Sequence, residues 1–81
     1  MIVEVRLFAT LASYLPQEDR AKGATALDVP VSASVNDVAV RLGIPDALTR
    51  VALVNGQEAG PERRLAAGDV VTLFPPLMGG N

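Results

Sequence analysis

The sequence predicts an α+β domain in which a four- to five-stranded mixed sheet packs on one main helix. Two observations support this. Strand-like runs open the chain at Ile2–Ala9 and recur as far as Val70–Phe74. Between them, one stretch from Ser34 to Gly43 has helical spacing and a signal at each end. A chain of 81 residues can bury one hydrophobic core, so we expect one domain.

The first predicted strand, Ile2–Ala9, alternates with a period of two. Glu4 and Arg6 mark one of its faces as exposed. The residues expected to face the core are Val3, Val5 and Leu7. Phe8 then falls on the exposed face, which is unusual for a large aromatic side chain.

The next three segments connect this strand to the main helix. Thr10–Leu15 is predicted as a short helix that ends before Pro16, and Gln17–Gly23 as a polar, mobile loop. Ala26–Val31 is predicted as a second strand at an edge of the sheet, because Pro30 cannot donate to a neighbouring strand. We expect the first two strands to form a hairpin.

The main helix has a start signal, a stop signal and one apolar stripe. Ser34 is an N-cap residue, and Asp37 occupies the capping-box position three residues later. Gly43 is suited to close the helix in the left-handed region, and Pro45 prevents its continuation. The stripe expected to face the sheet contains Val35, Val38, Ala39 and Leu42.

The second half of the chain predicts a hairpin and a final strand. Val51–Val54 is followed by Asn55 and Gly56, the dipeptide that most favours a tight hairpin turn. Gln57–Ala59 then returns briefly, and the last strand is Val70–Phe74. The order of elements therefore gives a single sheet–helix core.

Composition excludes several functions for this chain. It has no Cys and no His, which excludes disulfides, thiolate zinc sites and Ser–His triads. A net charge of −2 and scattered basic residues argue against a nucleic-acid partner. We expect no membrane span, no bound metal or cofactor and a cytoplasmic location. The chain has little catalytic machinery of its own.

The C-terminus differs from the rest of the sequence. Residues 1–74 are predicted to form the folded body, and residues 75–81 an extended, flexible tail. Pro75 and Pro76 lack N–H donors, and each proline restricts the backbone to extended conformations. From Pro75 to Gly80 this tail can reach roughly 20 Å beyond the body.

The end of the tail suits entry into another protein's active site. Gly79 and Gly80 have no side chains, so their backbone can pass through a narrow channel. Leu77 and Met78 are expected to fill apolar sockets in that partner. The alternative is an ordinary frayed terminus, in which Gly and Pro are also common.

Two aromatic residues are predicted to lie together on the exposed face of the sheet. Phe8 and Phe74 both face outward if the two registers are right. They would then form an apolar patch at the root of the tail, and such patches are typical of interfaces. The alternative is a register shift that returns one ring to the core.

Several motifs together make the chain resemble a known family. They are Leu7–Ala9, Val54–Gly56, Leu65, Ala67–Val70, Leu73–Pro76 and Gly79–Gly80. In this combination the chain resembles the MoaD/ThiS family of ubiquitin-like, β-grasp sulfur carriers over residues 1–80. The Phe-Pro-Pro motif that precedes the double glycine is most similar to the small subunit of molybdopterin synthase.

The resemblance implies a β-grasp fold and a sulfur-carrier role. An E1-like enzyme would use ATP to adenylate the carboxylate of Gly80, and a persulfide donor protein would convert it to a thiocarboxylate. The tail would then enter the large subunit of molybdopterin synthase and deliver sulfur to a pterin precursor. A chain without Cys or His can serve this chemistry because its partners supply the catalysis.

The sequence departs from the family pattern at Asn81, which follows the double glycine. Adenylation of Gly80 then requires a peptidase that removes Asn81; otherwise this member has lost the carrier role. Three further functions stay open: a ubiquitin-like protein modifier, a sulfur carrier for thiamine or cysteine-type biosynthesis, and a non-catalytic β-grasp interaction module.

Overall fold

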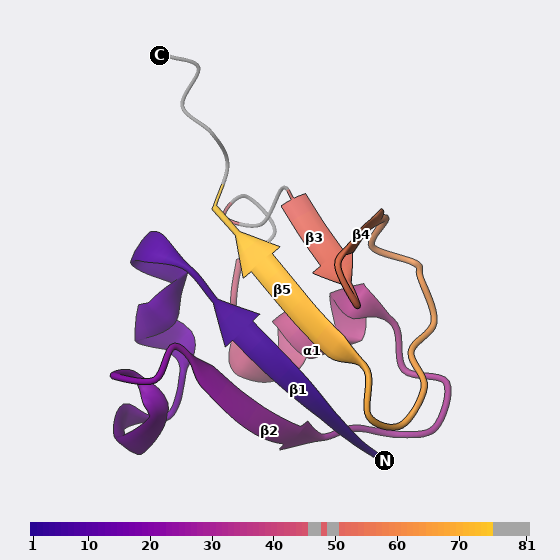
Figure 1. Cartoon of the computed structure of the whole chain (residues 1–81), viewed down its shortest axis with the longest axis horizontal. Helices are drawn as coiled ribbons and strands as arrows, with labels where there is room; N and C mark the ends of the chain where they lie inside the picture. The colour runs from indigo at the N-terminus through magenta and orange to yellow at the C-terminus, as the bar shows by residue number, and fades with distance from the viewer. Residues whose placement is uncertain (46–47, 49–50, 76–81) are drawn as a thin grey trace.

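The computed structural model describes residues 1–45, 48 and 51–75 (Figure 1). Its strands are β1 (Ile2–Leu7), β2 (Ala24–Asp28), β3 (Val51–Val54), β4 (Gln57–Ala59) and β5 (Val70–Phe74). Helix α1 spans Val35–Leu42, and two 3₁₀ helices span Ala9–Tyr14 and Gln17–Asp19. Residues 76–81 lie outside the described part of the chain, so the division into a body and a tail stays a prediction.

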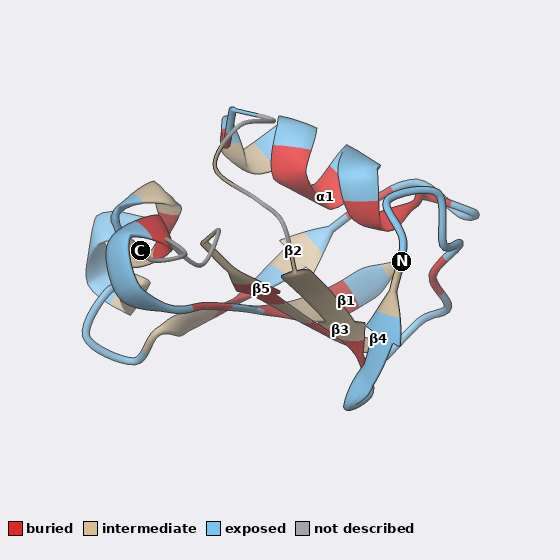
Figure 2. Cartoon of the chain, turned by 90° about the horizontal axis from the view of Figure 1, so that it is seen from above, coloured by how far each residue is buried: buried red, intermediate tan, exposed pale blue. Residues whose placement is uncertain are grey.

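The strands form one mixed sheet in the order β2-β1-β5-β3-β4. β1 runs parallel to β5, while β1–β2, β3–β5 and β3–β4 are antiparallel pairs. Helix α1 covers one face of this sheet, and none of the helices in the described residues lies over the other face (Figure 2). The predicted α+β class and the five-stranded mixed sheet are confirmed.

The hydrophobic core lies between α1 and the covered face of the sheet. The predicted inward residues of β1 are fully buried there, with Val71 and Leu73 beside them from β5. The 3₁₀ helix Ala9–Tyr14 adds Leu11, and Leu65 anchors the long connection before β5. Alternate residues of β1 and β5 therefore point either into the core beneath α1 or toward the open face of the sheet.

Helix α1 has the ends that the sequence predicts. The Asp37 N–H donates to the Ser34 hydroxyl, and the Asp37 carboxylate accepts from the Ser34 N–H, forming a capping box. Gly43 closes the helix at φ +79°, where a side chain would be strained. Val35, Val38 and Ala39 of the predicted stripe are buried, and Leu42 is partly buried.

The predicted position of the second strand, Ala26–Val31, is wrong by two residues at its start and by three at its end. β2 begins at Ala24 because the Leu7 N–H donates to the Gly23 carbonyl and sets the register of the hairpin. It ends at Asp28, just before Val29 donates to Met1 and before Pro30, which has no N–H to donate. β2 does lie at an edge of the sheet, as predicted.

Two other boundaries also differ. β1 ends at Leu7 instead of Ala9, because Ala9 has φ +54° and turns the chain into a 3₁₀ helix. The segment predicted as a loop, Gln17–Gly23, contains the 3₁₀ helix Gln17–Asp19. The predicted Asn55-Gly56 turn is confirmed, with both residues at positive φ.

Candidate functional site: an aromatic patch at the end of β5

The parallel pairing of β1 and β5 brings the two phenylalanines together. Leu7 lies opposite Leu73, and the Phe8 N–H donates to the Leu73 carbonyl at 3.2 Å. The rings of Phe8 and Phe74 have centroids 4.8 Å apart and are tilted by 31°. This is the spacing of a favourable aromatic pair. The predicted neighbouring placement of the two rings is confirmed.

Local structure holds Phe8 on the open face of the sheet. The Phe8 carbonyl accepts from Leu11, whose side chain is fully buried, so the 3₁₀ helix fixes the backbone after Phe8. The side chain of Phe8 is 47% exposed, although it is one of the largest apolar groups in the chain. Phe74 is partly buried. The pair is therefore accessible at the surface.

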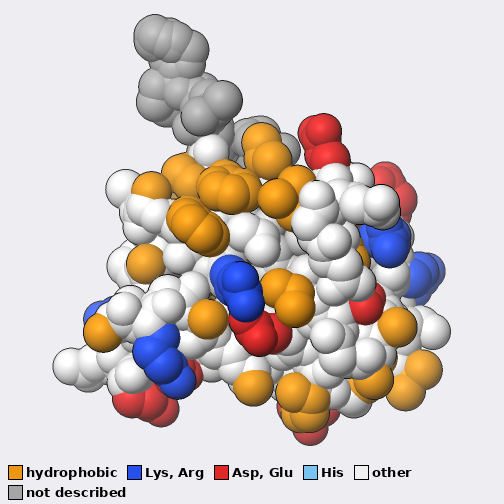
Figure 3. All heavy atoms as spheres, in the orientation of Figure 1, with side chains coloured by type: hydrophobic (Ala, Val, Ile, Leu, Met, Phe, Trp, Pro, Cys, Tyr) orange, Lys and Arg blue, Asp and Glu red, His pale blue; other side chains and the backbone are white. Residues whose placement is uncertain are grey.

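Two residues of β3 extend this surface. Val51 lies opposite Phe74, and Leu53 opposite Thr72, so all of them share the open face. Val51 and Leu53 are both partly exposed. We call the surface formed by Phe8, Val51, Leu53 and Phe74 the aromatic patch. Figure 3 shows hydrophobic side chains gathered at this end of the open face.

The sequence analysis named the two rings of the patch and did not name Val51 or Leu53. The signal was available: Val51–Val54 alternates, and the hairpin turn at Asn55 and Gly56 fixes its direction. What the sequence could not provide was the β3–β5 register, which places Val51 beside Phe74.

Charged residues of β1 border the aromatic patch on the open face. Arg6 and Glu4, on the same face of β1, form an exposed ion pair. In Figure 3 a basic and an acidic side chain lie together below the apolar cluster. The open face is thus apolar near the end of β5 and charged toward its middle.

A polar network fixes the start of β5. The Asp69 carboxylate accepts from the Asn55 side chain at 3.0 Å and from the Ala66 N–H at 2.8 Å. The Asn55 side-chain oxygen in turn accepts from the Val70 N–H at 2.9 Å. These donors, first the Ala66 backbone and then Asn55, lower the pKa of Asp69 below its ordinary value. The network ties the hairpin turn to the strand that leads into the tail.

The remaining predicted site residues follow the patch in sequence. Pro75 is described, partly buried, and comes directly after β5. The other predicted residues, Pro76, Leu77, Met78, Gly79, Gly80 and Asn81, lie outside the described residues. Their roles stay predictions.

Two other features of the described residues concern metals and membranes. Within residues 1–45, 48 and 51–75, no three Asp or Glu side chains gather to hold a metal ion. No helix in that part of the chain is long and apolar enough to cross a membrane.

Comparisons with known proteins support the fold and the family. The model of the Mut7-C ubiquitin family matches residues 1–78. SAMP1 from Haloferax volcanii is 28% identical, with 99% of this chain and 100% of that chain covered and a TM-score of 0.71. No curated protein matches the chain significantly.

Two further solved structures share the fold. A putative molybdopterin converting factor subunit 1 from Pyrococcus furiosus is 24% identical over 94% of this chain and 98% of that chain, with a TM-score of 0.69. A chain in the complex of subunits 1 and 2 of molybdopterin-converting factor from Helicobacter pylori is 20% identical over 99% and 100%, with a TM-score of 0.61. Together with the family match, these likenesses confirm a MoaD/ThiS-like β-grasp protein.

Proposed function

The chain belongs to the Mut7-C ubiquitin family, and from this premise we propose that it is a sulfur carrier. After removal of Asn81, the carboxylate of Gly80 is converted to a thiocarboxylate and donates sulfur to a small-molecule acceptor. The observation that supports this best is the position of the aromatic patch at the end of β5, the strand that leads into the glycine-ended tail.

The patch gives a partner enzyme a place to hold the body of the carrier. Phe8 and Phe74 present a paired aromatic surface, and large aromatic side chains are frequent anchors of protein interfaces. A partner docked on this surface meets the root of the tail at Pro75. The six residues from Pro75 to Gly80 can then extend roughly 20 Å into its active site, at about 3.3–3.6 Å per residue.

The chemistry requires activation by that partner. A carboxylate is a poor electrophile, so its oxygen must leave as part of AMP before a sulfur nucleophile can replace it. An E1-like adenylating enzyme supplies ATP and the catalytic groups, and a persulfide protein supplies the sulfur. Asn81 must first be removed by a peptidase, because Gly80 has no free carboxylate in the full sequence.

For the sulfur acceptor we propose the molybdopterin branch. The Phe-Pro-Pro motif of residues 74–76 supports it. So does the fold shared with converting-factor subunit 1 of Pyrococcus furiosus and with the Helicobacter pylori complex of subunits 1 and 2. In this branch the partner that receives the tail is the large subunit of molybdopterin synthase.

Intact-mass spectrometry tests the carrier function. The chain shortened to end at Gly80 is incubated with a cognate activating enzyme, ATP and a persulfide donor. We expect the mass increase that corresponds to replacement of one oxygen by one sulfur. The unshortened chain, ending at Asn81, is the matched control and should remain unmodified. An unchanged mass in the shortened chain, with an enzyme that activates its own carrier, would contradict the proposal.

A second candidate function is protein modification, in which Gly80 forms isopeptide bonds with lysines of other proteins. The likeness to SAMP1 favours it, since another solved structure, 28% identical to this chain, bears the name small archaeal modifier protein 1. Both functions begin with adenylation and separate afterwards. Immunoblots of cells that express the tagged chain distinguish them: conjugates of higher mass support the modifier, and a single band supports the carrier.

A further inference from the structure

Asn55 and Gly56 form the exposed turn between β3 and β4, whereas Asn36 is followed by an aspartate. We propose that Asn55 is a site of chemical modification by deamidation, which hydrogen bonds to β5 suppress in the folded protein and which loosening of the turn permits. The chemistry does not depend on the sulfur-carrier function. It gives Asn55 a significance beyond its place in the turn.

Deamidation requires an accessible backbone nitrogen after the asparagine. The Gly56 nitrogen attacks the side-chain carbon Cγ of Asn55, the Cγ–Nδ2 bond breaks, and ammonia leaves with the proton lost from the Gly56 nitrogen. Water then opens the five-membered imide at either carbonyl carbon, which gives aspartate or isoaspartate. Gly56 has no side chain to crowd this attack, and a Cβ built on it would meet no atom within 4 Å.

β5 holds both ends of the Asn55 side-chain amide. Its Nδ2 donates to the Asp69 Oδ1 at 3.0 Å, and its Oδ1 accepts from the Val70 N–H at 2.9 Å. The Asn55 backbone N–H also donates to the Val70 carbonyl at 2.8 Å. Ring closure turns Cγ toward the Gly56 nitrogen and expels Nδ2, so both side-chain hydrogen bonds must break first.

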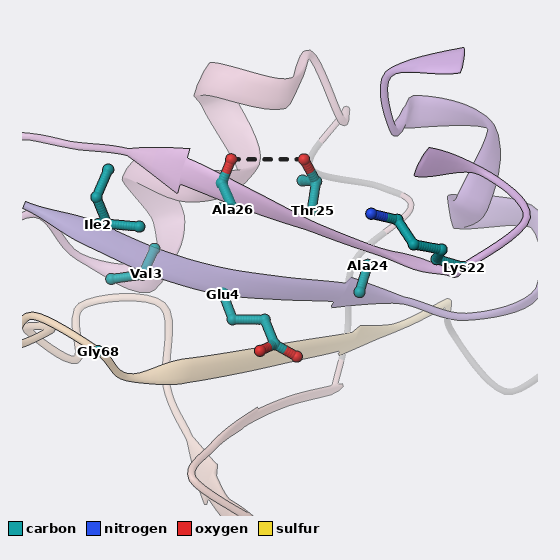
Figure 4. A pocket seen from close by; sticks show the side chains of 8 residues that line it. All are labelled: Ile2, Val3, Glu4, Lys22, Ala24, Thr25, Ala26 and Gly68. Carbon is teal, nitrogen blue, oxygen red and sulfur yellow. Dashed lines mark hydrogen bonds between the residues drawn. The ribbon is translucent and has the colours of Figure 1, made fainter. Parts of the chain in front are cut away.

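Asp69, the acceptor of this amide, is itself fixed. Its Oδ2 accepts from the Ala66 N–H at 2.8 Å, and its carbonyl accepts from the Glu4 N–H of β1 at 2.9 Å. The Gly68 N–H donates to the Ile2 carbonyl at 2.8 Å, and Figure 4 shows Gly68 where the chain enters β5, beside the first residues of β1. The acceptor is therefore held by β1 as well as by its own turn.

The charge of Asp69 adds to this protection. Hydrogen bonds from Ala66 and then from Asn55 lower the pKa of Asp69, so its carboxylate is ionised at neutral pH. Attack on Cγ places negative charge on the Asn55 amide, and a carboxylate 3.0 Å from the amide nitrogen raises the energy of that state. Asp69 thus opposes both the movement that the reaction needs and the charge that it develops.

The products of deamidation do not fit this network. An aspartate at position 55 presents a second carboxylate to Asp69, so an attractive contact becomes repulsion between like charges. Isoaspartate instead adds a carbon atom to the backbone of the turn. Either product weakens the connection between the turn and β5, and the β3–β5 register places Val51 opposite Phe74 in the aromatic patch. An effect on partner docking would rest on the proposed function.

Peptide mapping by mass spectrometry measures the reaction in the full chain. The protein is incubated at mildly alkaline pH, folded in buffer and unfolded in urea, and aspartate and isoaspartate at position 55 are quantified over time. We expect the folded protein to react about tenfold more slowly, because two hydrogen bonds must break first. Asn36 is the internal reference and should react more slowly than Asn55 in urea, since a residue with a side chain follows it. Equal rates at Asn55 in buffer and in urea would overturn the inference.

Asp69→Ala separates the local network from general unfolding. The folded variant should deamidate several-fold faster than the folded wild type, and the two should react equally in urea. Two controls lie outside the network: Ser34→Ala removes the cap of α1, and Glu58→Ala removes an exposed acid from β4. Both should keep the folded rate of the wild type. An equal increase in Ser34→Ala and Asp69→Ala would overturn the inference, because the reaction would then proceed through general unfolding.

A second experiment introduces the product directly. Asn55→Asp should lower the urea midpoint of unfolding, because it places two carboxylates together. Adding Asp69→Asn exchanges the two side chains: position 69 then donates to position 55, and the Val70 and Ala66 N–H groups keep their acceptors. We expect the double variant to recover most of the lost midpoint. A lack of recovery, or an unchanged midpoint in Asn55→Asp alone, would contradict the inference. None of these measurements uses the activating enzyme, so their outcome is separate from that of the carrier test.

Discussion

The covered and open faces of the sheet take alternate residues from the same strands. On β1 and β5, the residues that face α1 are at most 2% exposed. On the open face, Phe8 is 47% exposed and lies against Phe74, with Val51 and Leu53 beside them. Apolar side chains on the covered face stabilise the fold, whereas those on the open face remain in contact with water. Under the proposed function, the apolar surface of the open face is the place where a partner docks.

The largest effect is expected from a substitution on the covered face. Leu73→Ala removes a side chain that is 1% exposed and leaves a cavity between β5 and α1. We expect the free energy of unfolding to fall by about 3 kcal/mol. For a domain of this size, this lowers Tm by roughly 12–24 °C. Urea denaturation measures the change. A loss below about 1 kcal/mol would show that the core is less tightly packed than its burial indicates.

Phe8→Ala on the open face is expected to weaken partner binding more than it lowers stability. Loss of the aromatic pair should reduce stability by about 1 kcal/mol. Binding to the activating enzyme should weaken by about tenfold or more, because the patch loses its most exposed anchor. Isothermal titration calorimetry measures this.

Ile2→Ala is the matched control for Phe8→Ala. Ile2 lies on the same open face, is 52% exposed, and is the first residue of β1, at the end of the strand away from the patch. Its replacement should change binding by less than about twofold, a difference below 0.5 kcal/mol. If both variants weaken binding equally, the interface covers the whole open face and is not centred on the patch.

A smaller loss of stability is expected when the N-terminal cap of α1 is removed. Ser34→Ala removes the hydroxyl that accepts from the Asp37 N–H, and should lower stability by about 1 kcal/mol. Asn36→Ala, at an exposed position of the same helix, should have little effect. Thermal unfolding followed by circular dichroism compares the two. Partner binding should be unchanged in both, since neither alters the open face.

Local signals explain what the sequence predicts well. Ser34, Asp37 and Gly43 define α1 because capping depends on residues only a few positions apart. The turn at Asn55 and Gly56 is defined in the same way. The outward position of Phe8 follows from alternation within a single strand.

Contacts between distant segments account for what the sequence did not predict. The position of β2 depends on the bond from Leu7 to Gly23, and Val51 joins the patch only through its register with Phe74. The network around Asn55 was also missed, because it depends on Asp69 of a distant segment meeting the hairpin turn. Composition and spacing contain no signal for that meeting.

The smallest expected effect concerns pH and the network that fixes the start of β5. Hydrogen bonds from Ala66 and Asn55 lower the pKa of Asp69 below its ordinary value of 3.8. The folded state therefore favours the ionised carboxylate more than the unfolded state does. The stability that it contributes is complete above about pH 5 and is lost as pH falls through the lowered pKa. Below that value both states are protonated.

Asp69→Asn tests this pH dependence, because asparagine has the shape of aspartate and does not titrate. Between pH 5 and pH 2 the variant should lose less stability than the wild type. The slope of the free energy of unfolding against pH should decrease by the equivalent of less than about one bound proton. Glu58→Gln, which removes an exposed acid on β4 outside this network, is the control for the loss of one negative charge. Urea denaturation over this range measures all three proteins. An unchanged slope in Asp69→Asn would mean that the turn between Asn55 and Asp69 is held without the carboxylate's charge. In that case, low pH would alter neither the start of β5 nor the aromatic patch at its end.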